Sequence, residues 1–156
     1  MKTLILYASK RGATRQIAER IAKQLNGSVL CDITQTPVIS LTDYDCVILG
    51  GAVTAGLIPR KLKRFVQNST NELLAKRLGI FVSGLNANGL VEYLSQNFPA
   101  PLLEAATAKA FLGGIYDPAL CSFFARAIIK AAAKLDKYTS TIDESEIVAF
   151  ARKMDF

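Results

Sequence analysis

The chain of 156 residues contains no histidine and no tryptophan, and it has only three cysteines. The missing histidine excludes Ser-His-Asp and Cys-His catalysis, most zinc sites and the usual proton shuttle near neutral pH. Cys31, Cys46 and Cys121 are widely spaced and form no C-x-x-C motif, so we expect idle thiols in a reducing cytoplasm and no metal site. Any chemistry is therefore expected to come from a bound cofactor.

Long apolar runs are also missing, although 51% of the residues are hydrophobic. Charged residues interrupt every stretch that could span a bilayer. The opening MKTLILYASK lacks a small-residue cleavage site, which is more typical of a first strand than of a signal peptide. This length and composition predict a single domain over residues 1–156.

Apolar runs of strand length alternate with helical patterns along the whole chain. This alternation predicts an α/β fold with a parallel sheet covered on both faces, in the doubly wound strand order 2-1-3-4-5. The prolines at 99 and 101 are expected to interrupt the helical pattern. We predict strands at 3–8, 28–33, 45–51, 78–84 and 109–116, and helices at 14–25, 59–70, 89–98, 121–135 and 143–154.

Three predicted loops, at 9–14, 50–58 and 83–89, leave the carboxyl ends of strands one, three and four. Each contains glycine and small polar residues. In doubly wound sheets, ligands bind beyond these strand ends, near the switch point between the first and third strands. We therefore expect the three loops to form one binding site.

The first of these loops has the composition of an anion site. It lies at a predicted helix N-terminus, where unpaired N–H groups attract anions, and Gly12 permits a close approach of the backbone. Ser9 and Thr14 add hydroxyl groups, and Lys10 and Arg11 add positive charge. Taken alone, the loop is equally compatible with an ordinary capped turn.

Other phosphate-binding motifs do not match this stretch. A P-loop requires Gly-Lys-Ser/Thr, and a dinucleotide fingerprint requires G-x-G-x-x-G, whereas only Gly12 is present. A receiver domain would need acidic residues after the first strand. A small phosphatase would need a cysteine followed by an arginine around such a loop, and Cys46 lies inside a predicted strand.

The stretch LYASKRGATRQIAERIA resembles the flavodoxin phosphate loop, [ST]-x-[ST]-G-x-T, with Arg11 in place of the middle hydroxyl residue. The chain resembles the flavodoxin-like menaquinone-dependent protoporphyrinogen oxidases more closely. That resemblance extends over DCVILGGAVTAG, FLGGIYDP, FFARAIIKAAAK and EIVAFARKM. It implies a flavodoxin-like, five-stranded doubly wound sheet and a bound flavin mononucleotide (FMN).

The resemblance also assigns residues to the cofactor. Flavodoxins usually stack an aromatic on the ring, but here Ala55 stands at the corresponding position, leaving Leu57, Leu85 or Tyr116 to cover it. By this resemblance the phosphate is wrapped by Ser9, Lys10, Arg11, Gly12, Ala13 and Thr14, and the ring is flanked by Gly51, Ala52, Val53, Thr54, Ala55, Gly56, Ser83, Gly84, Leu85, Asn86 and Gly89.

Three functions remain open on the sequence. The first is a cytoplasmic FMN protein that transfers electrons to a redox partner protein or a quinone. The second is a quinone-dependent protoporphyrinogen oxidase, which the resemblance implies. The third is a cofactor-free interaction domain of the same fold. Because reduced flavin is anionic and the chain carries a formal net charge of +6, we expect a less negative reduction potential than in acidic flavodoxins.

The segment 122–137 combines a basic stripe with an apolar face. We expect this helix to pack in the core with its lysines in solvent. The alternative is a helix that lies on anionic lipid, which would place the protein at the inner face of the membrane. No nucleic-acid partner is expected, because the cations lack interleaved aromatics and a known module.

Overall fold

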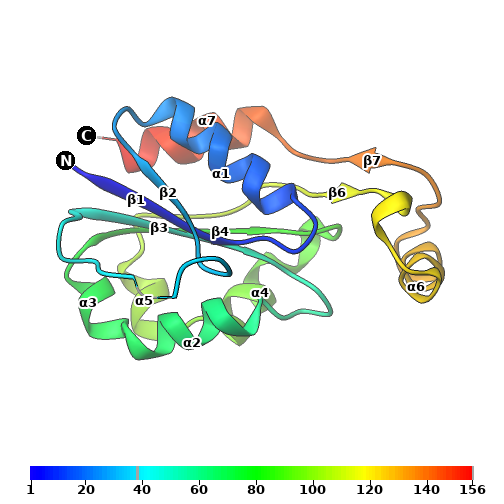
Figure 1. Ribbon diagram of the computed structural model, residues 1–156, viewed down its shortest axis with the longest axis horizontal. Helices are drawn as coiled ribbons and strands as arrows, with labels where there is room; N and C mark the ends of the chain where they lie inside the picture. Colours follow the sequence, from blue (N-terminus) through cyan, green and yellow to red (C-terminus); the bar gives the residue numbers. More distant parts are fainter. Residues whose placement is uncertain (38, 156) are drawn as a thin grey trace.

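The central element of the protein is a five-stranded parallel sheet, seen in a computed structural model that describes residues 1–37 and 39–155 (Figure 1). Its strand order is β2-β1-β3-β4-β5, which confirms the predicted doubly wound topology. The strands are β1 (Thr3–Ala8), β2 (Val29–Asp32), β3 (Cys46–Ala52), β4 (Arg77–Ser83) and β5 (Ala108–Phe111).

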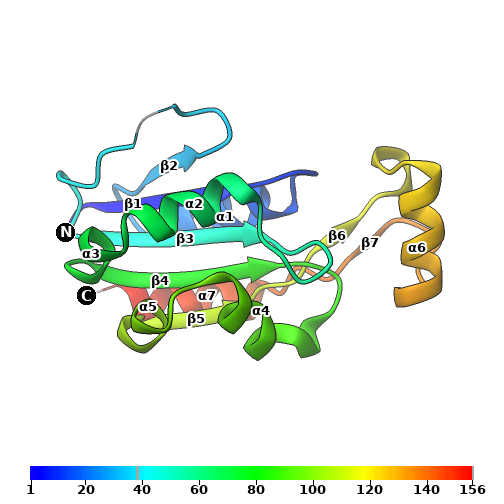
Figure 2. The ribbon, with the colours of Figure 1, turned by 90° about the horizontal axis from the view of Figure 1, so that it is seen from below.

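Helices cover both faces of the sheet (Figures 1 and 2). One face carries α1 (Ala13–Gln24) and α7 (Glu144–Met154), and the other carries α2 (Arg60–Asn68), α3 (Thr70–Leu74), α4 (Leu90–Asn97) and α5 (Ala100–Ala105). The carboxylate of Asp143 accepts from the Glu146 amide and caps α7. None of the helices in the described ranges is both long and apolar enough to cross a bilayer.

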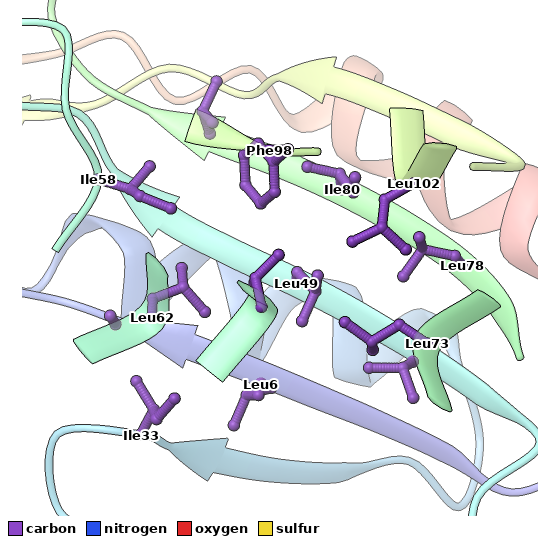
Figure 3. Close-up of a cluster of buried hydrophobic side chains, with 14 of the residues drawn as sticks. Leu6, Ile33, Leu49, Ile58, Leu62, Leu73, Leu78, Ile80, Phe98 and Leu102 are labelled. Carbon is purple, nitrogen blue, oxygen red and sulfur yellow. The ribbon is translucent and has the colours of Figure 1, made fainter. Parts of the chain in front are cut away.

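Two apolar layers hold the helices to the sheet, because successive strand residues point to opposite faces. On β1, Leu4 and Leu6 face the α2–α5 side, whereas Ile5 faces α1 and α7. Figure 3 shows Leu6 and Leu49 in the first layer. Each fully buried side chain of this kind contributes about 1.5–3 kcal/mol relative to an exposed one.

The strand register aligns the carboxyl ends of the three central strands. Ala8 lies opposite Gly51, and Ala52 lies opposite Ser83. The loops that follow β1, β3 and β4 therefore leave the same edge of the sheet side by side. In Figure 1 this edge lies opposite the end that carries both termini.

The fifth predicted strand, 109–116, is wrong in its second half. β5 ends at Phe111, and the chain turns at Gly113, whose φ is +91°. Ile115–Tyr116 forms β6, which pairs antiparallel with β7 (Thr139–Ser140) in a separate two-stranded sheet. The apolar run does not reveal this change, because both pieces have strand-like composition.

The segment 115–140, called the arm below, projects from the edge where the loops emerge (Figures 1 and 2). It contains β6, a 3-10 turn at Pro118–Leu120, the helix α6 (Phe123–Ala133) and β7. The expectation that this helix packs in the core is wrong, because no residue of α6 is buried. Phe123 and Phe124 are 75% and 78% exposed.

The helix expected over 89–98 ends before Pro99, as the prolines predict, but a second helix, α5, begins at once at Ala100. Pro99 precedes the helix and Pro101 lies in its first turn. First-turn N–H groups have no intrahelical acceptor, so a proline there removes no hydrogen bond. The predicted helix 59–70 ends two residues early, at Asn68, and the short α3 follows.

Candidate functional site

The loop between β1 and α1 leaves the helix N-terminus open. Gly12 has a φ of +93°, a conformation that favours glycine, and its amide donates to Ser9 Oγ at 3.0 Å. The first intrahelical bond runs from Gln16 N–H to Gly12 O at 3.0 Å. No side chain caps α1, and its first turn has no acidic residue. The amides of the first turn are thus available to an anion.

Thr14 ties this loop to the end of β4. Its Oγ1 lies 2.6 Å from Ser83 Oγ, and both residues are buried. The Thr14 hydroxyl, expected from the sequence to face the anion, is engaged in this hydrogen bond with Ser83. Thr14 therefore fixes the start of α1 against the neighbouring loop, and backbone amides with Lys10 and Arg11 remain as anion-facing groups.

The loop after β3 is a tight hairpin turn. Thr54 and Leu57 exchange two backbone hydrogen bonds of 2.9 and 3.0 Å across Ala55 and Gly56. These central residues have φ values of +50° and +80°, as a type I′ turn requires. A left-handed conformation costs alanine about 1 kcal/mol relative to glycine, so contacts elsewhere must hold Ala55 in place.

Asn97, the last residue of α4, holds that turn. Its Nδ2 donates to Gly56 O at 2.8 Å and to Tyr93 O at 2.7 Å, while its Oδ1 accepts from the Ile58 amide at 3.0 Å. The side chain is only 2% exposed, so water cannot replace these partners. Sequence reasoning missed Asn97, because two of its three partners, Gly56 and Ile58, lie 41 and 39 residues away in the chain.

The loop after β4 is bonded to its neighbours on both sides. Ser83 O accepts from the Val53 amide at 2.8 Å, and the Gly84 amide donates to Gly113 O at 3.1 Å. Further along, Asn86 O accepts from the Tyr93 hydroxyl at 3.2 Å. The Val53–Ser83 bond joins the 52–56 and 83–86 loops, and the other two bonds tie the second loop to Gly113 and to α4.

The three loops and α6 enclose a cleft of about 740 Å³, a size typical of cofactor sites. Of the residues assigned by sequence, Gly12, Gly51 and Gly89 do not line it. The assigned residues that do are Ser9, Lys10, Arg11, Ala13, Thr14, Ala52, Val53, Thr54, Ala55, Gly56, Ser83, Gly84, Leu85 and Asn86.

The cleft also has walls that sequence reasoning did not assign. Its lining includes Tyr93, Cys121 and Tyr116. Of these three, only Tyr116 is named in the sequence-based prediction, as a side chain that could cover the flavin ring. One face of α6 forms the far wall. These α6 residues recur at helical spacing: Ala125, Ile128, Ile129, Ala132 and Ala133. They were missed because the helix was expected to pack in the core.

The electrostatics of the cleft favour an anionic ligand. Lys10 and Arg11 are its only charged lining residues in the part of the chain that the structure describes, and no carboxylate lines it. An uncapped helix N-terminus adds partial positive charge at the same end. The residues thus fit FMN, with amides and cations for the phosphate and a largely apolar cleft for the ring.

Comparison with known proteins agrees with this geometry. Residues 4–143 match the family described as flavodoxin domain. A quinone-dependent protoporphyrinogen IX dehydrogenase from Leishmania major is 27% identical over 150 residues, which cover 86% of this chain and 63% of that protein. Flavodoxin 2 from Bacillus cereus has 22% identity and a TM-score of 0.65, covering 99% of this chain and 97% of its own. Flavodoxin 1 from the same organism has 18% identity and a TM-score of 0.59, with the same coverage.

A doubly wound sheet with an open anion loop at its switch point defines a nucleotide-binding α/β protein. Within that class, the chain belongs to the flavodoxin domain family. It is an FMN-binding redox protein of this family, as the sequence predicts. The chain spans about 63% of the length of its curated relative.

Asn97→Leu should destabilise the protein, because a similar volume is kept while three buried hydrogen bonds are lost. The Ile58 amide and the Gly56 carbonyl then lose their bonds to this side chain, and we expect a loss of about 2–4 kcal/mol in the free energy of unfolding. Urea denaturation measures this change. Asn68→Leu is the matched control, because Asn68 is an exposed residue that also ends a helix. Equal stability of the two variants would contradict this role of Asn97.

Proposed function

We propose that the FMN phosphate binds the loop 9–14 and that the flavin ring lies between the loops 52–56 and 83–86. The open N-terminus of α1, beside two cations and no carboxylate, carries this proposal. Bound FMN supplies one- and two-electron chemistry. The chain's own residues bind the phosphate, orient the ring with backbone amides and set the local charge.

The ring is held without an aromatic from the two central loops. Residues 52–56 and 83–86 contain no Phe, Tyr or Trp, so main-chain groups and Leu85 form these walls. The Asn97 contacts and the Val53–Ser83 backbone bond keep those walls fixed before the cofactor arrives. A preformed site loses less conformational entropy on binding.

Arg11→Gln should weaken FMN binding and make the reduction potential of the bound cofactor more negative. The reduced cofactor is anionic, so a nearby cation stabilises it and removal of that cation opposes reduction. Arg11 is exposed, and solvent screening limits the expected shift to the order of tens of millivolts. Potentiometric titration at saturating FMN measures it.

Arg64→Gln is the control, because Arg64 is an exposed cation on α2 that does not line the cleft. It should change neither the affinity nor the potential. Identical potentials for Arg11→Gln and the parent protein would show that the loop cations do not face the flavin.

A second, narrower function is the transfer of electrons from protoporphyrinogen to a quinone. The relative from Leishmania major bears this activity in its name. The arm supports a membrane quinone as acceptor, because it extends from the cleft edge and exposes Phe123, Phe124 and Leu120. We propose that the arm lies on anionic lipid, with Arg126 and Lys130 near the head groups.

Replacing both phenylalanines of the arm, Phe123→Ser with Phe124→Ser, should weaken binding to vesicles at least tenfold. Burial of each exposed phenylalanine in lipid contributes about 1.5–3 kcal/mol. Sedimentation with vesicles containing about one-third phosphatidylglycerol measures the binding. Each basic residue near the anionic surface contributes about 1 kcal/mol of electrostatic attraction, which salt screens, so binding should be lost at high salt.

Val91→Ser provides the control, because Val91 is 80% exposed but lies on α4, outside the arm. Vesicle binding that is unaffected by the double change, or lost equally in Val91→Ser, would refute the proposed membrane contact. FMN binding should be the same in all three proteins.

A further inference from the structure

Tyr116 is a buried tyrosine at the root of the arm. It lies on β6 opposite Thr139 of β7, and only 2% of its surface is exposed. Its side chain nevertheless lines the FMN cleft. It also lines a smaller hollow at the base of α6, formed with Phe123, Arg126, Ala127, Lys130 and Asp136.

The Tyr116 hydroxyl has no hydrogen-bond partner among residues 1–37 and 39–155. Its oxygen is not one of the fully buried polar atoms that lack a partner in the described ranges. The hydroxyl oxygen is therefore accessible from one of the two hollows that Tyr116 lines. The other buried polar groups of the site are engaged: Thr14 pairs with Ser83, and Asn97 makes three bonds. Tyr93, on another wall, already donates to Asn86 O. Tyr116 thus differs from these groups, because its hydroxyl makes no hydrogen bond to the described residues.

The surroundings of this donor select the ligand. The far wall of the cleft is the face of α6 with small and aliphatic side chains, such as Ile128 and Ala132, and Ile115 and Leu85 complete it. No carboxylate lines the cleft in the described ranges, and Asp136 lines only the smaller hollow that Tyr116 shares with it. A flat apolar ring carrying a carbonyl oxygen complements these walls and this donor.

We propose that Tyr116 is the specificity-determining donor for a second ligand of the cleft, a flat apolar ring system whose carbonyl oxygen accepts the phenol hydrogen. This ligand lies between the flavin-facing loops and the inner face of α6. The inference rests on the proposed FMN site, because the second ligand takes the part of the cleft that the cofactor leaves free. Tyr116 binds and orients this ligand, and no proton transfer is assigned to it.

The test compares Tyr116→Phe with the parent holo-protein by equilibrium binding. The probe is 2,3-dimethyl-1,4-naphthoquinone, whose substituted ring cannot add to the Cys121 thiol in the same cleft. Its hydrocarbon analogue, 2,3-dimethylnaphthalene, has the same shape without an acceptor oxygen. Titrations followed by the visible absorption of oxidised bound FMN give a Kd for each ligand.

Tyr116→Phe should raise the Kd of the naphthoquinone about three- to tenfold, as expected for one lost hydrogen bond. The Kd of dimethylnaphthalene should not change, because the phenyl ring and the cleft wall are kept. Tyr138→Phe, which alters a 60% exposed tyrosine outside the cleft, should affect neither ligand. This comparison of two ligands and two variants isolates the hydroxyl group.

An unchanged naphthoquinone Kd in Tyr116→Phe would overturn the inference, as would equal weakening of both ligands or a parent holo-protein that binds no naphthoquinone. Each of these results leaves the FMN proposal standing, since FMN affinity is measured on the same samples. A parent protein that does not retain FMN would instead overturn the proposed function, and the second site with it.

Discussion

The 2.6 Å hydrogen bond between Thr14 Oγ1 and Ser83 Oγ connects two parts of the site that are far apart in sequence. It is buried at the sheet edge where β1, β3 and β4 end in register, so it fixes the start of α1 relative to the loop after β4. The first-turn amides of α1 remain open because the N-cap residue is Gly12, which has no side chain to accept from them. The buried contact thus aligns the ring-facing loop with a helix start that is open to a phosphate.

The rest of the cleft divides into a rigid side and an exposed side. On the rigid side, Asn97 holds a turn that contains the left-handed Ala55, and backbone bonds join neighbouring strand ends. On the other side, α6 contributes a wall although none of its residues is buried. The loops on the rigid side are therefore anchored to the sheet and to α4, whereas the wall proposed for a second ligand belongs to an arm attached through two short strands.

Much of the architecture is predictable from the sequence, because apolar strand runs such as 3–8 alternate with helical patterns. The open turn at 9–14 is predictable too, since Gly12 and its flanking hydroxyls are local in sequence. The Thr14–Ser83 and Asn97–Gly56 contacts are not, because they join residues 69 and 41 positions apart. The arm was missed because the 3.6-residue periodicity of α6 is the same whether its apolar face meets a core or solvent.

The most direct test of the account is the affinity of the apo-protein for FMN compared with riboflavin, which differs by lacking the phosphate. Calorimetric titration of both ligands gives the contribution of the loop at 9–14. Two charge-assisted hydrogen bonds from main-chain amides are worth about 3 kcal/mol or more, so FMN should bind at least about 100-fold more tightly. Equal affinity for the two flavins would contradict the central claim that the open N-terminus of α1 binds the phosphate.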